Sequence, residues 1–253
     1  MNASGMPILL TSSAIAYDKN VKLTDTKQRI QETINSVEQW IRISPNSPIV
    51  ICDGSGFDFN ELIIKKFPNQ KIEIIYFQNN ISMIEIKGRG YGEGAIIDYA
   101  IKNSRVIKES GHFAKCTAKL WVNNFYDFFQ KYREGRMLFK GVFSHVFHPL
   151  KTTEFSYIDT RFYITDTKNY LKYFNLAHEF IDFRTGYGLE DAFRDILIKN
   201  EIKHSLSLVY PVISGVGGGT GIHYKNTPRR LFKEKIRLEI VRRNKNFQYL
   251  FND

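Results

Sequence analysis

The first half of the chain alternates short apolar runs with segments whose apolar residues recur at helical spacing. Residues 7–12, 49–52 and 71–77 are apolar runs of strand length. Between the first two runs, apolar side chains at positions 30, 34, 37, 40 and 41 predict one face of a helix, and residues 60–66 predict a shorter helix before the third run. This order of strands and helices is typical of a parallel sheet built from βαβ units.

The second half predicts further elements of both kinds. We expect a glycine-rich turn at residues 88–94, helices at 95–103, 167–174 and 190–199, strands at 112–122, 155–164 and 206–212, and a glycine-rich loop at 215–221. The sequence therefore predicts an α/β fold with a mostly parallel sheet flanked by helices. It predicts a single catalytic domain over residues 1–224, followed by a basic helical tail over 225–253.

Composition limits the class of protein and the cellular compartment that we expect. A hydrophobic share of 43% and a charged share of 25% are ordinary for a globular protein and argue against a disordered chain. No window reaches the roughly 18–20 uninterrupted apolar residues of a membrane span, and residues 1–8 do not resemble a secretory signal. Cys52 and Cys116 are too few for a disulfide framework, so we expect a cytoplasmic protein.

The positive charge is concentrated at one end. Residues 225–253 hold nine Lys or Arg and three acidic residues, so they carry six of the ten net positive charges. Phe232, Ile236 and Ile240 recur among these cations, a pattern that can lie on the anionic inner face of the cytoplasmic membrane. The alternative is a solvated basic helix without a partner. A nucleic-acid partner is not expected, because its charge would be spread along a groove rather than collected in a tail.

Two segments suit a nucleotide. Residues 53–56 (Asp-Gly-Ser-Gly) follow an expected strand, and ligands of open α/β sheets bind beyond the carboxyl ends of the strands. Asp53 can accept a hydrogen bond from a ribose hydroxyl or a base, although an ordinary turn with an Asp cap explains the same residues. Residues 87–94 alternate glycine with other residues before an expected helix, and Lys87 and Arg89 add charge suited to a diphosphate.

Other charged residues fall on expected strands and at a helix start. Lys115 and Lys119 share one face of a strand, which predicts a phosphate or carboxylate partner unless the strand lies at an edge. Asp159 and Arg161 share a face of residues 155–164 and either pair with strand neighbours or serve a site. Glu190-Asp191 opens a helix, where the helix dipole alone favours acidic residues.

In their order, these motifs resemble the GT-A glycosyltransferases, particularly bacterial enzymes that build capsule, lipopolysaccharide or O-antigen chains. The resemblance spans about residues 7–224. The segments that carry it are Leu10-Thr11-Ser12, Arg29, Asp53-Gly54-Ser55, residues 88–94, residues 115–119, Glu190-Asp191 and residues 215–221.

The resemblance implies roles for individual residues. Thr11, Asp53, Gly54 and Ser55 would contact the nucleoside, and Gly88, Arg89 and Gly90 its ribose and diphosphate. Asp191 would be the general base, oriented by Glu190, with Asp159 as the other candidate. Many GT-A enzymes hold a divalent metal on Asp-x-Asp, which this chain lacks. Either another carboxylate holds Mg²⁺ or Mn²⁺, or Lys115, Lys119 and Arg89 neutralise the leaving diphosphate directly.

The expected activity is transfer of a sugar from a nucleotide-sugar donor, UDP-type by preference, to a saccharide or lipid-linked acceptor. A sugar-nucleotide nucleotidyltransferase is the alternative, but those enzymes carry a Gly-rich, Arg-containing loop after the first strand, and residues 12–16 contain no glycine. A non-catalytic nucleic-acid-binding protein is a third possibility, motivated by the net charge and the 14% aromatic residues.

Overall fold

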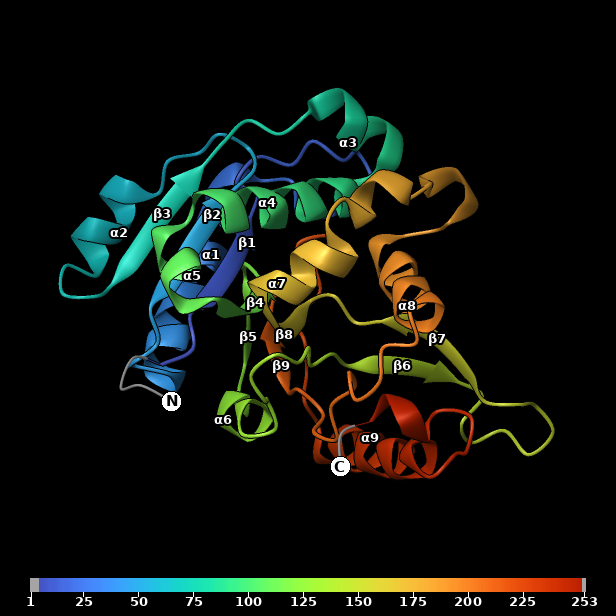
Figure 1. The fold of residues 1–253 in the computed structure, drawn as a ribbon. Helices are drawn as coiled ribbons and strands as arrows, with labels where there is room; N and C mark the ends of the chain where they lie inside the picture. The colour runs from blue at the N-terminus through green and yellow to red at the C-terminus, as the bar shows by residue number, and fades with distance from the viewer. Residues whose placement is uncertain (1–4, 252–253) are drawn as a thin grey trace.

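The computed structural model describes residues 5–251. Its central sheet consists of β3 (Ile72–Tyr76), β2 (Ile49–Asp53), β1 (Ile8–Ser12), β4 (His112–Thr117) and β8 (Phe162–Asp166), in this spatial order (Figure 1). The first four strands are parallel, and β8 pairs antiparallel with β4. The expected α/β class and mostly parallel sheet are therefore confirmed.

Helices cover both faces of the sheet. One face packs against α1 (Thr26–Ile43), α2 (Asn60–Lys66) and α6 (Phe125–Phe129), and the other against α4 (Arg89–Asn103), α5 (Arg105–Ser110), η1 (Tyr170–Phe174) and α8 (Leu189–Lys199). Successive side chains of β1 point to opposite faces, so Leu9 joins the core under α4 and Leu10 the core under α1. A sheet buried on both faces explains why its strands are continuous apolar runs.

The glycine-rich segment at residues 88–94 is not a turn. A further helix, α3 (Ile81–Lys87), precedes it, and α4 already begins at Arg89. Only Gly88, with a φ of 82°, lies between the two helices. Since each glycine inside a helix costs about 1 kcal/mol relative to alanine, the sequence pattern placed the helix start six residues too late.

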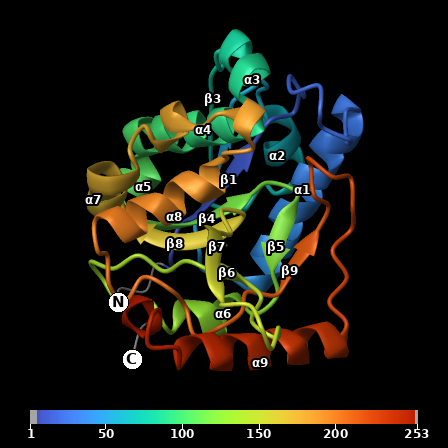
Figure 2. The same ribbon diagram turned by 90° about the vertical axis from the view of Figure 1, so that its right-hand side faces the viewer.

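Three expected strands differ from the structure. Residues 112–122 break at Lys119, whose φ is 81°, into β4 and a separate β5 (Leu120–Val122). Residues 155–164 contain a turn at 159–161 between β7 (Glu154–Ile158) and β8. Residues 206–212 form no extended strand; Leu206 makes isolated bridges, and β9 (Ile213–Gly215) begins later. The chain therefore leaves the sheet at Lys119, and β5 pairs with β9 beside α1 (Figure 2).

The remaining elements are a strand pair that includes β7, several short helices and a C-terminal helix. β6 (Gly141–Ser144) pairs with β7. The other short helices are α7 (Thr167–Asn169), η2 (Ala177–Phe180), η3 (Phe183–Thr185) and η4 (Gln248–Leu250), and the C-terminal helix is α9 (Pro228–Arg242). The expected helices at 167–174 and 190–199 are confirmed as α7 with η1 and as α8.

The basic tail is joined to the core. Val241, Leu250 and Phe251 are almost fully buried in the same hydrophobic cluster as β7 and α8. The boundary after residue 224 stays a prediction, but removal of the tail would expose core surface. Within residues 5–251, no helix combines the length and the apolar character needed to cross a bilayer.

Candidate functional site

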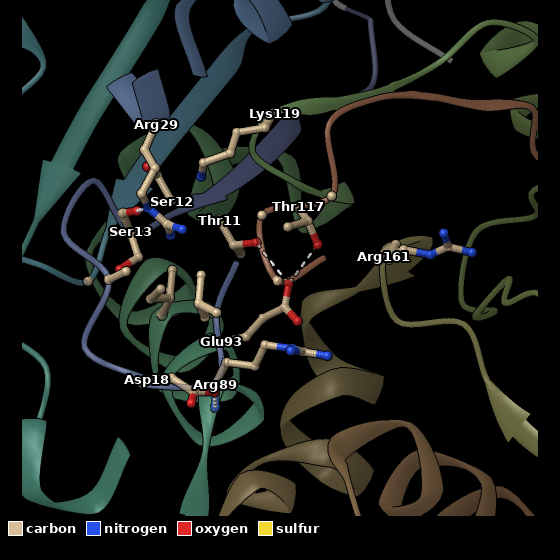
Figure 3. Close-up of a pocket in the computed structure, with 18 of the residues that line it drawn as sticks. Thr11, Ser12, Ser13, Asp18, Arg29, Arg89, Glu93, Thr117, Lys119 and Arg161 are labelled. Atoms are coloured by element: carbon tan, nitrogen blue, oxygen red, sulfur yellow. Dashed lines mark hydrogen bonds between the residues drawn. The ribbon is translucent and has the colours of Figure 1, made fainter. Parts of the chain in front are cut away.

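A pocket of about 210 Å³ lies at the carboxyl ends of β1 and β4. The loop after β1, the first turns of α4 and the glycine-rich loop at residues 217–219 form its other walls (Figure 3). Its charged lining residues are Arg29, Arg89, Lys119, Arg161, Asp18, Glu93 and Glu190. The pocket therefore lies where open α/β sheets bind ligands, and it combines cations with carboxylates.

Glu93, on α4, is held in place by three donors. Its Oε1 accepts from Thr11 Oγ1 at 3.2 Å and from Thr117 Oγ1 at 2.7 Å (Figure 3), and also from Lys115 Nζ. Burial raises the pKa of Glu93, but Lys115 and the two hydroxyls outweigh burial, so the pKa lies below its usual range. No donor within residues 5–251 bonds to Oε2, so a charged carboxylate oxygen remains for a ligand.

Lys115 has the carboxylate partner that its position predicted. Its side chain is completely buried, and besides Glu93 it donates to Thr117 Oγ1 at 3.0 Å and to the Thr160 carbonyl at 2.7 Å. Lys115 does not line the pocket. It therefore orients Glu93 instead of meeting a diphosphate itself.

Lys119 and Arg29 form the buried cationic side of the pocket. They are 2% and 6% exposed, and their charged ends converge from the turn after β4 and from α1 (Figure 3). Arg29 donates through Nε to the Ser13 carbonyl and through Nη1 to the Leu23 carbonyl, both at 2.8 Å. Burial, and then Arg29, lower the pKa of Lys119 to about 7. An anion in the pocket would stabilise both cations.

The start of α4 is fixed from the loop after β1. Asp18 Oδ2 accepts from the Arg89 N–H at 3.2 Å, and Asp18 Oδ1 accepts from the N–H and side chain of Asn20. A carboxylate at a helix N-terminus is favoured by the helix dipole. The Arg89 side chain itself is exposed and lines the pocket.

Of the acidic pair at the start of α8, only Glu190 lines the pocket. Burial raises the pKa of Glu190, and the nearby Glu93 charge raises it further. Asp191 accepts from the Gly188 N–H at 3.0 Å through Oδ2 and from Arg194 at 3.3 Å through Oδ1. The structure therefore shows Asp191 as a helix cap outside the pocket lining, and its expected role as a general base oriented by Glu190 stays a prediction.

The carboxylate of Asp159 also already has partners within the protein. Its buried carboxylate pairs with Lys140 at 3.0 Å and with Arg161 at 2.6 Å. Burial raises the pKa of Asp159, but Lys140 and Arg161 outweigh it and hold the pKa far below its usual range. Such a carboxylate is a poor proton acceptor. Of the two expectations for Asp159 and Arg161, the structure shows ion pairing, although Asp159 pairs with Arg161 itself as well as with Lys140.

Residues 53–55 mainly hold the loop after β1 in position beside the pocket. Asp53 is fully buried; its Oδ2 accepts from the Ala14 N–H at 2.9 Å, and its Oδ1 accepts from the Ser55 N–H at 2.7 Å. Ser55 Oγ in turn accepts from the Ile15 N–H at 3.0 Å. Of these three residues only Gly54 lines the pocket, so Asp53 and Ser55 position the loop after β1.

Gly88 and Gly90 also lie outside the pocket lining. A Cβ at Gly90 would lie 3.3 Å from Ile181 and 3.4 Å from Leu189, which shows that this glycine permits close helix packing. The glycines that do line the pocket are Gly54, Gly92 and Gly217–Gly219.

The sequence pattern did not assign Glu93 or Asp18 to the site, and it left Arg161 open between pairing on a strand and a role in a site. A signal for Glu93 existed in the expected carboxylate partner of Lys115. The register that sets Thr11 opposite Thr117 brings both hydroxyls to that same carboxylate. No spacing rule connects α4 to β4, so the partner could not be chosen from the sequence.

The pocket's donor set does not fit a resident divalent ion. Within residues 5–251, no three His, Cys, Asp or Glu side chains are grouped to hold a metal. Glu93 Oε1 and both Asp18 oxygens already accept hydrogen bonds from the protein, and Lys119 and Arg29 occupy the opposite wall. The carboxylate oxygens that remain, Glu93 Oε2 and those of Glu190, are too few to hold Mg²⁺ or Mn²⁺ without further oxygen ligands from a bound molecule.

Comparisons with known proteins were made at the levels of family, sequence and fold. No protein-family model matches the chain, and no curated protein matches its sequence. Among solved structures, core-mannan synthase A of Aspergillus fumigatus in its Mn/GDP form is 12% identical, with a TM-score of 0.46 over 99% of this chain and 87% of that one.

Two further structures are similar to comparable degrees. The 4-diphosphocytidyl-2C-methyl-D-erythritol synthase of Anaerococcus prevotii is 11% identical, with a TM-score of 0.44 over 93% of this chain and 97% of that one. HddC of Yersinia pseudotuberculosis is 15% identical, with a TM-score of 0.36 over 65% and 78%.

Proposed function

We propose that this protein is a glycosyltransferase that moves a sugar from a nucleotide-sugar donor, UDP-type by preference, to a saccharide or lipid-linked acceptor in surface polysaccharide assembly. The observation that carries the proposal is the joint placement of Glu190, Glu93 and the cations Lys119 and Arg29 around one pocket. The reaction needs these chemical groups: a proton acceptor, a hydroxyl-binding carboxylate and cations for a leaving diphosphate.

Each group has a distinct role in the proposal. Glu190 is the general base, because a half-buried carboxylate with a raised pKa is a better proton acceptor at neutral pH than a paired one. Glu93 stays charged and accepts a hydrogen bond from a sugar hydroxyl through Oε2. Arg29, Arg89 and Lys119 face the diphosphate, and Thr11 and Gly54 lie on the nucleoside side.

The proposed step is a base-assisted displacement. Glu190 takes the proton of the acceptor hydroxyl while the acceptor oxygen forms a bond to the anomeric carbon. The bond from that carbon to the diphosphate oxygen breaks, and the nucleoside diphosphate leaves with the electron pair. The cations stabilise the negative charge that develops on the leaving oxygen.

The test combines a donor screen with one substitution. UDP-, GDP-, CMP- and dTDP-sugars are screened by thermal shift, and the binding donor is then used in transfer assays. We expect Glu190→Gln to lower the transfer rate by ~10²–10⁴-fold with nearly unchanged donor affinity. Transfer in the wild-type protein should rise with pH as Glu190 loses its proton.

Asp191→Asn is the matched control, since it removes the neighbouring carboxylate outside the pocket lining. It should keep near-normal turnover and cost about 1 kcal/mol of unfolding free energy or less, as expected for a helix cap. Near-normal turnover in Glu190→Gln would rule out this base. Loss of turnover in Asp191→Asn with the fold intact would restore Asp191 as the base.

A sugar-nucleotide nucleotidyltransferase is the second candidate, because the loop after β1 lines the pocket through Ser13, Ala16 and Tyr17. This activity would join a nucleoside triphosphate to a sugar phosphate and release pyrophosphate. The same donor screen, extended to nucleoside triphosphates with sugar 1-phosphates, separates the two reactions. Pyrophosphate release without sugar transfer would replace the glycosyltransferase proposal.

For the tail, the proposal includes attachment to an anionic membrane surface. On α9, Phe232, Ile236 and Ile240 are 66%, 39% and 42% exposed at four-residue intervals. Arg229, Lys233 and Lys235 are exposed on the same helix. An exposed apolar row between cations matches the chemistry of an anionic lipid surface.

Because the tail contributes to the core, point substitutions test this attachment better than truncation. Phe232→Ser/Ile236→Ser/Ile240→Ser and Arg229→Gln/Lys233→Gln/Lys235→Gln should each reduce sedimentation with anionic phosphatidylglycerol vesicles. Zwitterionic phosphatidylcholine vesicles serve as the control. Equal sedimentation of wild type and both variants with anionic vesicles would contradict the membrane role.

A further inference from the structure

Two buried cations in the pocket lack an anionic partner in direct contact. Lys119 Nζ makes no hydrogen bond within residues 5–251, although the side chain is 98% buried and lines the pocket. Arg29 uses Nε and Nη1 on backbone carbonyls, which are neutral. A buried charge without a partner is unfavourable, so its retention points to a ligand.

The backbone around Lys119 is built to hold it there. Lys119 has a left-handed φ of 81°, which costs a residue with a side chain conformational energy. The conformation is fixed from both sides, because the Ala118 N–H donates to the Thr11 carbonyl at 2.9 Å and the Val216 N–H donates to the Lys119 carbonyl at 3.0 Å. A Cβ at Gly215 would collide with that carbonyl, so the glycine allows this close approach.

The glycine-rich loop covers the two cations. A Cβ at Gly218 would lie 3.7 Å from Lys119 Cδ and 3.8 Å from Arg29 Nη1, so the loop backbone passes directly beside both side chains. The N–H groups of Gly218 and Gly219 have no protein acceptor within the described part of the chain. The loop is anchored there because the Lys22 N–H donates to the Gly219 carbonyl at 3.0 Å.

We propose that Lys119, Arg29 and the backbone of Gly218 and Gly219 form a subsite that binds the diphosphate of the nucleotide without a divalent metal ion. This inference rests on the proposed function for the identity of the ligand. The two cations supply the positive charge that a metal would otherwise bring, which agrees with a donor set that does not fit Mg²⁺ or Mn²⁺.

The electrostatics of Lys119 give the subsite a measurable property. Arg29 faces Lys119 from α1 and lowers its pKa, while Asp53 on β2, Glu93 on α4 and Glu32 on α1 raise it less than burial lowers it. With a pKa of about 7, the free protein carries a partly neutral Lys119 at neutral pH. A bound diphosphate favours the ammonium form, so binding takes up a proton and weakens above pH 7.

The experiment measures binding of inorganic pyrophosphate, uridine and UDP by calorimetry in EDTA, at pH 6.5 and 8.5 and in buffers of different ionisation enthalpy. We expect the wild type to bind pyrophosphate and UDP without metal. Lys119→Met should bind both ~10–100-fold more weakly, the effect expected for loss of a charged hydrogen bond, with unchanged uridine affinity. Its proton uptake should fall to that of the ligand alone.

Two further variants make the result decisive. Lys119→Gly removes the ammonium group and tolerates the left-handed backbone, so it guards against misfolding of Lys119→Met. Lys108→Met removes one exposed positive charge on α5 and should leave pyrophosphate affinity unchanged. Binding that occurs only with added Mn²⁺, or equal affinity in wild type and both Lys119 variants, would overturn the subsite.

The outcome separates this subsite from the proposed function. Lys119-dependent pyrophosphate binding in a protein that transfers no sugar would support the subsite and contradict the glycosyltransferase. Sugar transfer that requires Mn²⁺ and is unaffected by Lys119→Met would support the glycosyltransferase and contradict the subsite.

Discussion

The two glycine-rich segments of this protein have similar sequences but different structural roles. Residues 88–94 and 215–221 both contain four or more glycines within seven positions. In the first, the glycines lie at the start of α4, where they allow neighbouring helices to approach. In the second, Gly217–Gly219 form a loop that lines the pocket beside Lys119, Arg29 and Arg89.

The difference lies in what surrounds each missing side chain. A Cβ at Gly94 would collide with His178 Cβ and lie 2.7 Å from His178 Cγ, and a Cβ at Gly92 would lie 3.1 Å from Ile84. The atoms nearest to a Cβ at Gly219 would belong to the guanidinium group of Arg89, the first at 2.6 Å, and this flexible end can move. Gly92 and Gly94 therefore serve helix packing, while Gly218 and Gly219 keep space beside a charged pocket.

Gly94→Ala should have the largest effect and would test this division most directly. Overpacking against His178 costs about 1–3 kcal/mol or more and outweighs the ~1 kcal/mol that alanine gains over glycine in a helix. We expect a net loss of about 2 kcal/mol of unfolding free energy, measured by urea denaturation.

Gly92→Ala and Gly90→Ala complete a graded series. Their nearest neighbours lie at 3.1 Å and 3.3 Å, so the loss should shrink at Gly92, and Gly90→Ala should be neutral or stabilising by up to about 1 kcal/mol. Equal losses at all three positions would contradict the packing explanation, because only the space around the Cβ differs along the series.

Much of the fold followed from the sequence because it depends on local patterns. The strands at 8–12, 49–53 and 72–76 are apolar runs bounded by turn residues, the first two fully buried, and α1 shows a clear helical periodicity. The errors occur where tertiary contacts override local preference. The glycines in the first turns of α4 are stabilised by helix packing, and the left-handed backbone at Lys119 is fixed by hydrogen bonds beside the pocket. Neither feature produces a periodic pattern in the sequence.

The sequence predicted where the pocket lies in the fold, but the roles of individual residues stay predictions. The ends of β1, β2 and β4 do meet at the pocket, as the βαβ pattern implied. Roles depend on which hydrogen bonds each group already makes. Asp53 and Asp191 are engaged by backbone N–H groups, while Glu93 and Glu190 face the pocket. Residue type and spacing cannot distinguish an engaged carboxylate from an available one.

Gly218→Ala is the counterpart of Gly94→Ala in the second segment, with a smaller effect on the fold. Its Cβ would lie at ordinary contact distance from Lys119 and Arg29, and Gly218 is not among the residues with a left-handed φ. The free energy of unfolding should therefore change by no more than about 0.5 kcal/mol.

The same methyl group would nevertheless stand beside both cations and in the path of a bound anion. We expect pyrophosphate affinity to fall about tenfold, because the anion would lose direct contact with at least one charged donor. Calorimetry in EDTA measures the affinity, and Gly90→Ala is the matched control, since it makes the same chemical change outside the pocket lining. If Gly218→Ala lowers the free energy of unfolding as much as Gly94→Ala does, both segments serve folding and the contrast between them fails. If Gly218→Ala is stable and binds pyrophosphate normally, the loop does not border the diphosphate.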